Sequence, residues 1–197
     1  MRIYDISQEV FNCCVYQGDP VPNRERVAEI DNGDVCNLTA FSMCAHNGTH
    51  IDAPYHFYND GKTVDEISLS ELVGYACVVS FDGEITADDA FNILHKAKSL
   101  NAGKRILFKG DAVVTDEAAK VFANEGVYLI GNESQTVGPP DAPMEVHLEL
   151  LKKEVVLLEG IRLADVPCGS YFLCAAPINL GGADGAPCRA LLIDFAR

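Results

Sequence analysis

The apolar runs YACVVSF (residues 75–81), RILF (105–108) and VYLI (127–130) indicate how this chain folds. Each is short, apolar or aromatic and bounded by turn residues, which is typical of buried strands. The intervening residues 86–100 and 116–124 have the polar and apolar spacing of helices. Strands that alternate with helices in this way predict βαβ units and some parallel sheet.

The two intervening helices have clear start and stop signals. Thr86 is placed to cap the first, which has two aspartates in its first turn and two lysines near its end, as the helix dipole favours. The turn residues 101–103 follow it. Gly126 is predicted to end the second helix, Asp116–Asn124.

The segments on either side of this region add further strands and helices. A hairpin turn at residues 31–34 separates two strand-like segments. Further strands are predicted at residues 2–6, 24–30, 36–43, 155–158, 168–176 and 189–195, and helices at 68–73 and 144–154. Without an internal repeat or linker, the sequence predicts a single α/β domain with a mixed sheet over residues 1–197.

Composition limits the function classes. The chain of 197 residues has 48% hydrophobic residues, enough for a sizeable core, and 15 basic against 29 acidic residues give a net charge of −14. No basic stripe is present, so neither nucleic acid nor an anionic membrane is an expected partner. No apolar run approaches the ~20 residues of a membrane span, and the N-terminus resembles a strand without a signal peptide.

The eight cysteines contain no C-x-x-C pair, which argues against a zinc knuckle or a thioredoxin-type motif. Most of them lie in apolar, strand-like surroundings, so we expect buried thiols in the core. Without a secretory signal, the expected compartment is the reducing cytoplasm.

The glycine-rich loop GGADG at residues 181–185 has two interpretations. It could bind phosphate, but it lacks the Lys-Ser/Thr of a P-loop and no helix is predicted after it. A tight turn between two strands is favoured.

The chemistry is concentrated in HNGTHIDAPYH, residues 46–56, which contains three of the five histidines of the chain. Imidazole and carboxylate are ligands of zinc and manganese, so His46, His50 and Asp52 predict a metal site. A helix would place both histidines on one face, but the residues between them favour a turn that leads into a strand. His50 and Asp52 then point to the same face of that strand.

Two distant residues are candidates to complete the site. His147 lies on a predicted amphipathic helix, and Glu159 ends the apolar run VVLLE at residues 155–159. A carboxylate in that position is unusual unless it is paired or binds a metal.

The sequence resembles the cyclase-like metal-dependent hydrolases, a family that includes bacterial kynurenine formamidase and isatin hydrolase. The main match is HNGTHID at residues 46–52 with Pro54 and His56, and a second runs from His147 to Glu159-Gly160. Weaker matches cover DIS (5–7), GDP (18–20), residues 166–171, GAD (182–184) and RA (189–190).

This resemblance implies a swivelling β/β/α type of fold and a site with two divalent metal ions, zinc first and manganese as the alternative. His46, His50 and Asp52 would hold one ion, and Asp52, His147 and Glu159 the other, with both carboxylates as bridges. His56 would then serve as the general acid/base. The implied reaction is hydrolysis of an amide bond by a metal-activated water, as in arylformamidases.

The substrate is less defined, because the chain has no tryptophan where the formamidases carry one. Tyr16 stands at that place and is expected to stack against an aromatic substrate. N-formylkynurenine, a related aryl formamide and a cyclic amide all remain candidates. The alternatives are a metal-dependent cyclase or lyase and a non-catalytic metal-binding module. By analogy with relatives, we expect a homodimer or a higher homo-oligomer that acts on a small molecule.

Overall fold

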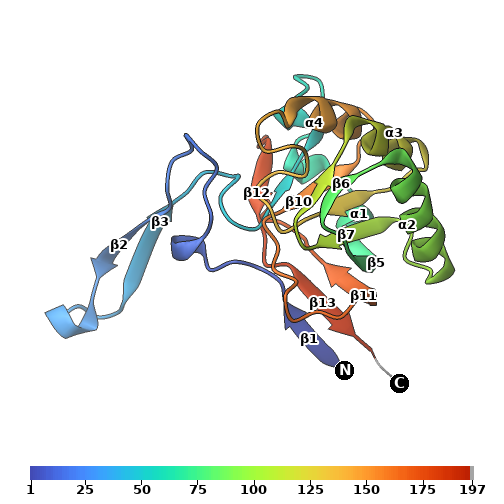
Figure 1. The fold of residues 1–197 in the computed structure, drawn as a ribbon. Coiled ribbons are helices and arrows are strands. Elements are labelled where there is room, and N and C mark those ends of the chain that lie inside the picture. Colours follow the sequence, from blue (N-terminus) through green and yellow to red (C-terminus); the bar gives the residue numbers. More distant parts are fainter. Residues whose placement is uncertain (196–197) are drawn as a thin grey trace.

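A computed structural model of the protein describes residues 1–195; the last two residues of the predicted domain lie outside the described part. Within this part, nine strands form one mixed sheet (Figure 1). Their order across the sheet is β1 (Arg2–Asp5), β13 (Leu191–Asp194), β11 (Gly169–Cys174), β5 (Val73–Ser80), β7 (Arg105–Lys109), β9 (Leu129–Gly131), β10 (Val156–Glu159), β4 (His50–Asp52) and β12 (Gly185–Pro187). The predicted α/β class and mixed sheet are confirmed.

The centre of the sheet is parallel, from β5 through β7 and β9 to β10, and its flanking strands are antiparallel. The crossovers contain α2 (Ala87–Ser99), α3 (Asp116–Asn124) and α4 (Met144–Leu151), which lie together on one side of the sheet (Figure 1). A shorter helix, α1 (Leu69–Leu72), precedes β5. This is the βαβ pattern predicted from the three apolar runs.

Two apolar clusters lie on opposite faces of the sheet, and strand alternation divides residues between them. In β7, Ile106 and Phe108 pack into the cluster that also contains the buried residues of the three crossover helices. Leu107, which points the other way, packs into the second cluster. Because both faces are covered, the central strands are continuously apolar, as is typical of parallel strands.

The predicted helix cap is present. The Thr86 side chain accepts from the backbone N–H of Asp89, and the Asp89 carboxylate accepts from the backbone N–H of Thr86, which forms a capping box. Thr115 caps α3 in a similar way by accepting from the N–H of Ala118. These local bonds fix the start of both crossovers.

The predicted hairpin is present as β2 (Asn23–Ala28) and β3 (Leu38–Ser42), but it is a separate sheet that projects away from the body (Figure 1). A 3₁₀ turn, Ile30–Asn32, begins the connection. The hairpin does not hold the histidine cluster, which lies on β4 (His50–Asp52) of the large sheet and on the turns beside it.

Three short strands were not predicted: β12, and the parallel pair β6 (Gly83–Ile85) and β8 (Ala112–Val114). Each has three residues, too few to give a periodic signal. Within residues 1–195, no helix combines the length and apolar character that a bilayer crossing requires.

The cysteine prediction was only partly correct. All eight are free thiols, but only Cys77 is buried. Cys14, Cys36 and Cys168 are exposed, and the other four are half-buried. An apolar neighbourhood in sequence did not predict burial, because several of these residues lie in loops or on outer strands.

Candidate metal centre

The site residues predicted from the sequence are brought together in space. One cavity of about 260 Å³ is lined by all seven of them: Tyr16, His46, His50, Asp52, His56, His147 and Glu159. They come from the N-terminal loop, β4 and the turns on either side of it, α4 and the end of β10. Tertiary folding therefore joins segments that are about a hundred residues apart.

Strand β4 carries two of these side chains, His50 and Asp52. Because side chains alternate along a strand, His50 and Asp52 share one face while Ile51 is fully buried in the core on the other. The strand is hydrogen-bonded on both edges, to β10 and to β12. In the antiparallel register Glu159 lies opposite His50, which places the two on the same face.

His46 lies in the turn before β4. Its Nδ1 is 2.8 Å from Oδ1 of Asp52, and its Nε2 is 2.9 Å from Oδ2 of Asp184. The ring also packs against the backbone of Gly185, where a Cβ atom would be 2.7 Å from Cε1 of His46. Residue 185 therefore has to be glycine for His46 to keep this position.

The two carboxylates at the centre are both buried, with Asp52 1% exposed and Glu159 2% exposed. Nε2 of His147 is 3.2 Å from Oε1 of Glu159 and 3.7 Å from Oδ2 of Asp52. Nε2 of His50 is 3.2 Å from Asp52 and 3.6 Å from Glu159. Among the residues that the structure describes, no lysine or arginine pairs with either carboxylate. Two buried carboxylates surrounded by imidazoles are a donor set that suits divalent cations.

The ring nitrogens of His50 and His147 that face away from the carboxylates support this interpretation. Nδ1 of His50 is 3.1 Å from the carbonyl oxygen of Gly48, and Nδ1 of His147 is 2.9 Å from that of Pro143. A carbonyl only accepts, so each Nδ1 carries a proton, and Nε2, which faces the carboxylates, is the nitrogen that a metal would take. Metal-bound histidines are typically held by such a second hydrogen bond.

The pKa values follow from burial and from these carboxylates. Burial lowers the pKa of His46 and of His147, but hydrogen bonds to Asp52 and to Glu159 respectively outweigh it, and both pKa values rise to about 9. Burial and the negative charge of Asp52 raise the pKa of Glu159. Burial by itself would raise the pKa of Asp52, but hydrogen bonds from His46 and His50 hold this pKa well below the usual value.

His56 lies in the 3₁₀ turn Pro54–His56 and is partly exposed to the cavity. Its ring centroid is 4.1 Å from that of His46, and its Nδ1 is 3.3 Å from Oδ2 of Asp184. Burial lowers its pKa below that of the other site histidines. His46, Asp52 and His56 also offer ligand atoms within 4.8 Å of one another, as do His50, Asp52 and Glu159. The geometry of His56 is therefore compatible with a proton carrier and with a further ligand.

Some residues of the site were not assigned from the sequence. Asp184 lies in the glycine-rich loop, which is indeed a turn, but its carboxylate faces two of the histidines. Gln135 and Thr136 also line the cavity. The only sequence signal for Asp184 was its weak family match. Gln135 and Thr136 gave no signal, because they belong to an irregular loop.

Similarity to known proteins identifies the family of this chain. Residues 4–139 match the Cyclase family, described as putative cyclase. The kynurenine formamidase of Erythrobacter litoralis is 33% identical over 97% of this chain and 93% of its own length. The chain belongs to the putative cyclase family.

Other members of the cyclase family extend the comparison. Cyclase-like protein 2 of Arabidopsis thaliana is 32% identical over 85% of this chain and 69% of its own length. A solved structure described as a potential metal-dependent hydrolase with cyclase activity is 30% identical, with a TM-score of 0.82, and covers 100% of this chain and 99% of its own. Isatin hydrolase A from Labrenzia aggregata shares the fold at 21% identity, with a TM-score of 0.83 over 97% and 93% of the two chains. The predicted family and fold are confirmed.

Proposed function

We propose that this cyclase-family protein is a metal-dependent hydrolase that cleaves an amide bond in a small molecule, with an aryl formamide as the first candidate. The observation that carries the proposal is the convergence of His46, His50, Asp52, His147 and Glu159 on one cavity. The hydrolase names of relatives at about 30% identity support the same chemistry.

The residues present fit two divalent ions. His46, His50 and Asp52 would hold one, and Asp52, His147 and Glu159 the other, so that the carboxylates offset the repulsion between the ions. Zinc is the first candidate and manganese the second; nitrogen and oxygen ligands are consistent with both, and the set has no sulfur ligand to decide between them. When bound, such ions lower the pKa of water and polarise a carbonyl group.

The chain itself contributes orientation and proton transfer. His56 faces the cavity beside His46, and its pKa, lowered by burial, leaves the ring neutral and able to accept a proton near pH 7. In this proposal His56 takes a proton from the attacking water and gives it to the leaving amine. General acid/base groups of this kind contribute typically ~10²–10⁴-fold.

The size of the cavity supports a small-molecule substrate. Its volume of about 260 Å³ suits one compact ligand. Tyr16 lines the same cavity and is 39% exposed, so its ring is available to stack on an aromatic substrate. Because the chain has no tryptophan, this contact would have less area than an indole provides.

A substrate panel tests the proposal. Zinc-loaded and manganese-loaded protein would be assayed with N-formylkynurenine, formanilide and isatin, beside protein treated with a chelator. We expect metal-dependent hydrolysis of at least one compound and about two ions per chain by elemental analysis. Failure of all three compounds with fully loaded protein would contradict the amidase assignment.

A cyclase or lyase is the second candidate, because the relative with a solved structure at 30% identity is described as having cyclase activity. The same donor set would then promote loss of water rather than its addition. Product mass separates the two: hydrolysis gives formate and the free amine from an aryl formamide, or a single product heavier by one water from a cyclic amide, whereas elimination gives a product lighter by one water. A binding module without activity is disfavoured by His56, which a module of that kind does not need.

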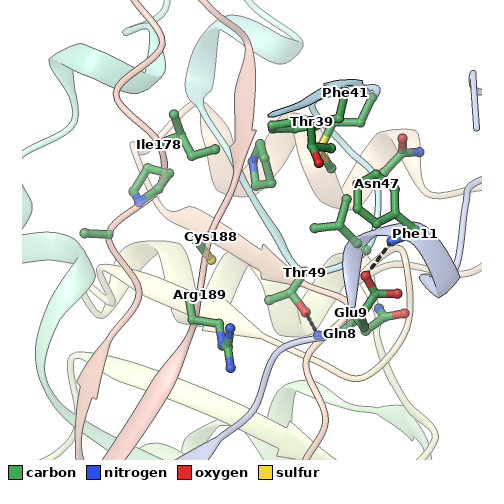
Figure 2. A pocket seen from close by; sticks show the side chains of 16 residues that line it. Gln8, Glu9, Phe11, Thr39, Phe41, Asn47, Thr49, Ile178, Cys188 and Arg189 are labelled. Carbon is green, nitrogen blue, oxygen red and sulfur yellow. Dashed lines mark hydrogen bonds between the residues drawn. The ribbon is translucent and has the colours of Figure 1, made fainter. Parts of the chain in front are cut away.

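We further propose that the protein acts as a homo-oligomer whose projecting hairpin packs on a second copy. An isolated two-stranded hairpin is marginally stable in water. Here the hairpin also exposes Val27, Leu38 and Phe41 at 53%, 51% and 56%. A groove of about 780 Å³ lies at its base, with Phe11, Phe41 and Ile178 in its walls (Figure 2). A second hairpin, related by two-fold symmetry, would bury these side chains.

Oligomeric state tests this packing. Wild-type protein is expected to run as a dimer or larger in light scattering, and Phe41→Asp to shift it toward the monomer. Phe91→Asp is the matched control, because Phe91 is 53% exposed on α2. A wild-type monomer at micromolar concentration would exclude the proposed packing.

The proposed compartment is the reducing cytoplasm. Cys14, Cys36 and Cys168 are exposed free thiols, and such thiols persist where glutathione or thioredoxin keeps them reduced. Fractionation of the native cells followed by immunodetection tests this assignment, and recovery of the protein outside the cytoplasm would contradict it.

A further inference from the structure

We propose that Asp184 is a positioning residue that holds His46 and His56 together, fixing one as a metal ligand and the other as a proton carrier. The proposal rests on the function proposed above, since it concerns the same site. It gives a role to a loop residue that the sequence motif leaves without one.

A single carboxylate oxygen makes both contacts. Oδ2 of Asp184 is 2.9 Å from Nε2 of His46 and 3.3 Å from Nδ1 of His56. The two rings lie side by side, with centroids 4.1 Å apart and planes 30° apart. Because an ionised carboxylate only accepts hydrogen bonds, the nitrogen that faces it on each ring carries the proton.

These contacts select opposite tautomers on the two rings. Both nitrogens of His46 face a carboxylate, so without a metal both carry a proton. With a metal bound, Asp184 would keep the proton on Nε2, and Nδ1, which lies 2.8 Å from Oδ1 of Asp52, is the nitrogen that would give up its proton to the ion. His56 is protonated at Nδ1, so its Nε2 keeps the lone pair that a general base needs. A carboxylate behind a ligating histidine is a recognised way to orient the ring and raise its basicity.

The loop that carries Asp184 is anchored on both sides. The backbone N–H of Ala53 donates to the carbonyl of Asp184 at 2.9 Å, and that of Val64 donates to the carbonyl of Ala183 at 2.9 Å. The N–H of Gly182 donates to Oδ1 of Asp65 at 2.9 Å. Immediately after Asp184, Gly185 begins β12 and pairs with Asp52. Asp184 is thus held at a fixed distance from the metal-binding strand.

The same geometry argues against Asp184 as a ligand. Its carboxylate meets the nitrogen of His46 opposite the one that faces Asp52, so the imidazole ring separates it from the central carboxylates. It is also half-exposed, whereas Asp52 and Glu159 are buried. A positioning role predicts a weaker site after substitution, whereas a ligand role predicts loss of an ion.

Asp184→Asn and Asp184→Glu test the proposal in the full-length protein. Zinc affinity is measured by competition with a chromophoric chelator, and we expect it to fall about 10–100-fold in Asp184→Asn, with partial recovery in Asp184→Glu. At saturating zinc, kcat on the best compound of the panel is expected to fall while KM changes little. Asp65→Ala is the control, because it releases the same loop without touching a histidine.

A second readout does not need turnover. Long-range ¹H–¹⁵N NMR spectra of histidine-labelled, zinc-loaded protein report the tautomer of each ring, with His46→Gln and His56→Gln to assign the signals. We expect His56 as the Nδ1–H tautomer in wild type and a mixture or the other tautomer in Asp184→Asn. Unchanged tautomers with unchanged zinc affinity would overturn the proposal, as would equal losses in Asp65→Ala.

The two proposals fail in different ways. If loaded wild-type protein turns over no compound, the proposed function fails, but zinc affinity and the tautomers still decide the role of Asp184. If wild type is active and Asp184→Asn matches it in affinity, tautomers and kcat, only the role of Asp184 fails.

Discussion

Glu159 lies opposite His50 in the antiparallel register of β10 and β4, with Oε2 of the acid 3.6 Å from Nε2 of the imidazole. The pairing connects two segments 109 residues apart in sequence. It also places the carboxylate on the face that α4 covers, where His147 reaches it. A strand register therefore assembles the donor set that the proposed function requires.

This register predicts the effect of Glu159→Gln. The amide keeps an oxygen for the backbone N–H of Val137, which donates to Oε1 at 2.9 Å, but it removes the charge that would bridge two cations. We expect elemental analysis to show fewer than two ions per chain and activity to fall at least ~10²-fold. Glu154→Gln, at an exposed acid paired with Lys62, should retain both ions and full activity.

His56→Gln separates the two roles that its geometry allows. If His56 carries protons, zinc content stays at the wild-type value while kcat falls ~10²–10⁴-fold. Loss of zinc in step with activity would identify His56 as a ligand instead. His95→Gln is a matched control, since that histidine lies on the exposed side of α2.

Gly185→Ala is predicted to displace His46. A Cβ there would approach Cε1 of His46 to 2.7 Å and the carbonyl oxygen of Ile51 to 2.7 Å, so the ring or the strand has to move. Overpacking of this kind costs typically ~1–3 kcal/mol in the free energy of unfolding. Urea titration should show the loss of stability, and zinc competition should show a loss of zinc affinity. Gly181→Ala, whose added Cβ meets Oδ2 of Asp65 at an ordinary 3.8 Å, should show neither.

The metal-free protein is predicted to lose stability as pH rises. His46 and His147 have pKa values of about 9, above the usual 6.5, because Asp52 and Glu159 favour their charged forms. A raised pKa stabilises the folded state fully below pH 6.5, and this stabilisation is lost as pH rises through 9. Each pH unit in that window costs up to about 1.4 kcal/mol per histidine.

Urea unfolding of chelator-treated protein at several pH values between 6.5 and 9.5 measures this loss. Saturating zinc should reduce or reverse the trend, because ligand binding requires unprotonated nitrogens. His147→Gln should reduce the loss of stability with pH in the metal-free protein, with the contribution of His46 remaining. Stability that increases from pH 6.5 to 9 without metal would contradict the assignment.

Tyr16 is predicted to affect substrate binding more than chemistry. Tyr16→Ala removes an aromatic face from the cavity wall and should raise KM several-fold with a smaller change in kcat, whereas Tyr16→Trp should lower KM for aryl substrates. Steady-state kinetics on the best compound of the panel measures both. Equal kinetics in all three proteins would remove Tyr16 from the substrate site.

Local patterns predicted most of the architecture. The start of α2 at Ala87 and the bounds of α3 at Asp116–Asn124 follow from cap residues and charges that act within one helical turn. The alternation of His50, Ile51 and Asp52 between faces follows from strand geometry. By contrast, the three-residue strands β6, β8 and β12 exist only because neighbouring strands offer them hydrogen-bond partners.

The candidate residues could be named from the sequence, since imidazole and carboxylate in the spacing of residues 46–56 predict a metal-binding motif from side-chain chemistry alone. How these residues meet follows from the tertiary structure. It places Glu159 opposite His50, turns His147 toward both carboxylates and brings Asp184 against His46 and His56. These contacts depend on strand register and loop packing over more than a hundred residues, and such long-range geometry leaves no periodic signal in the sequence.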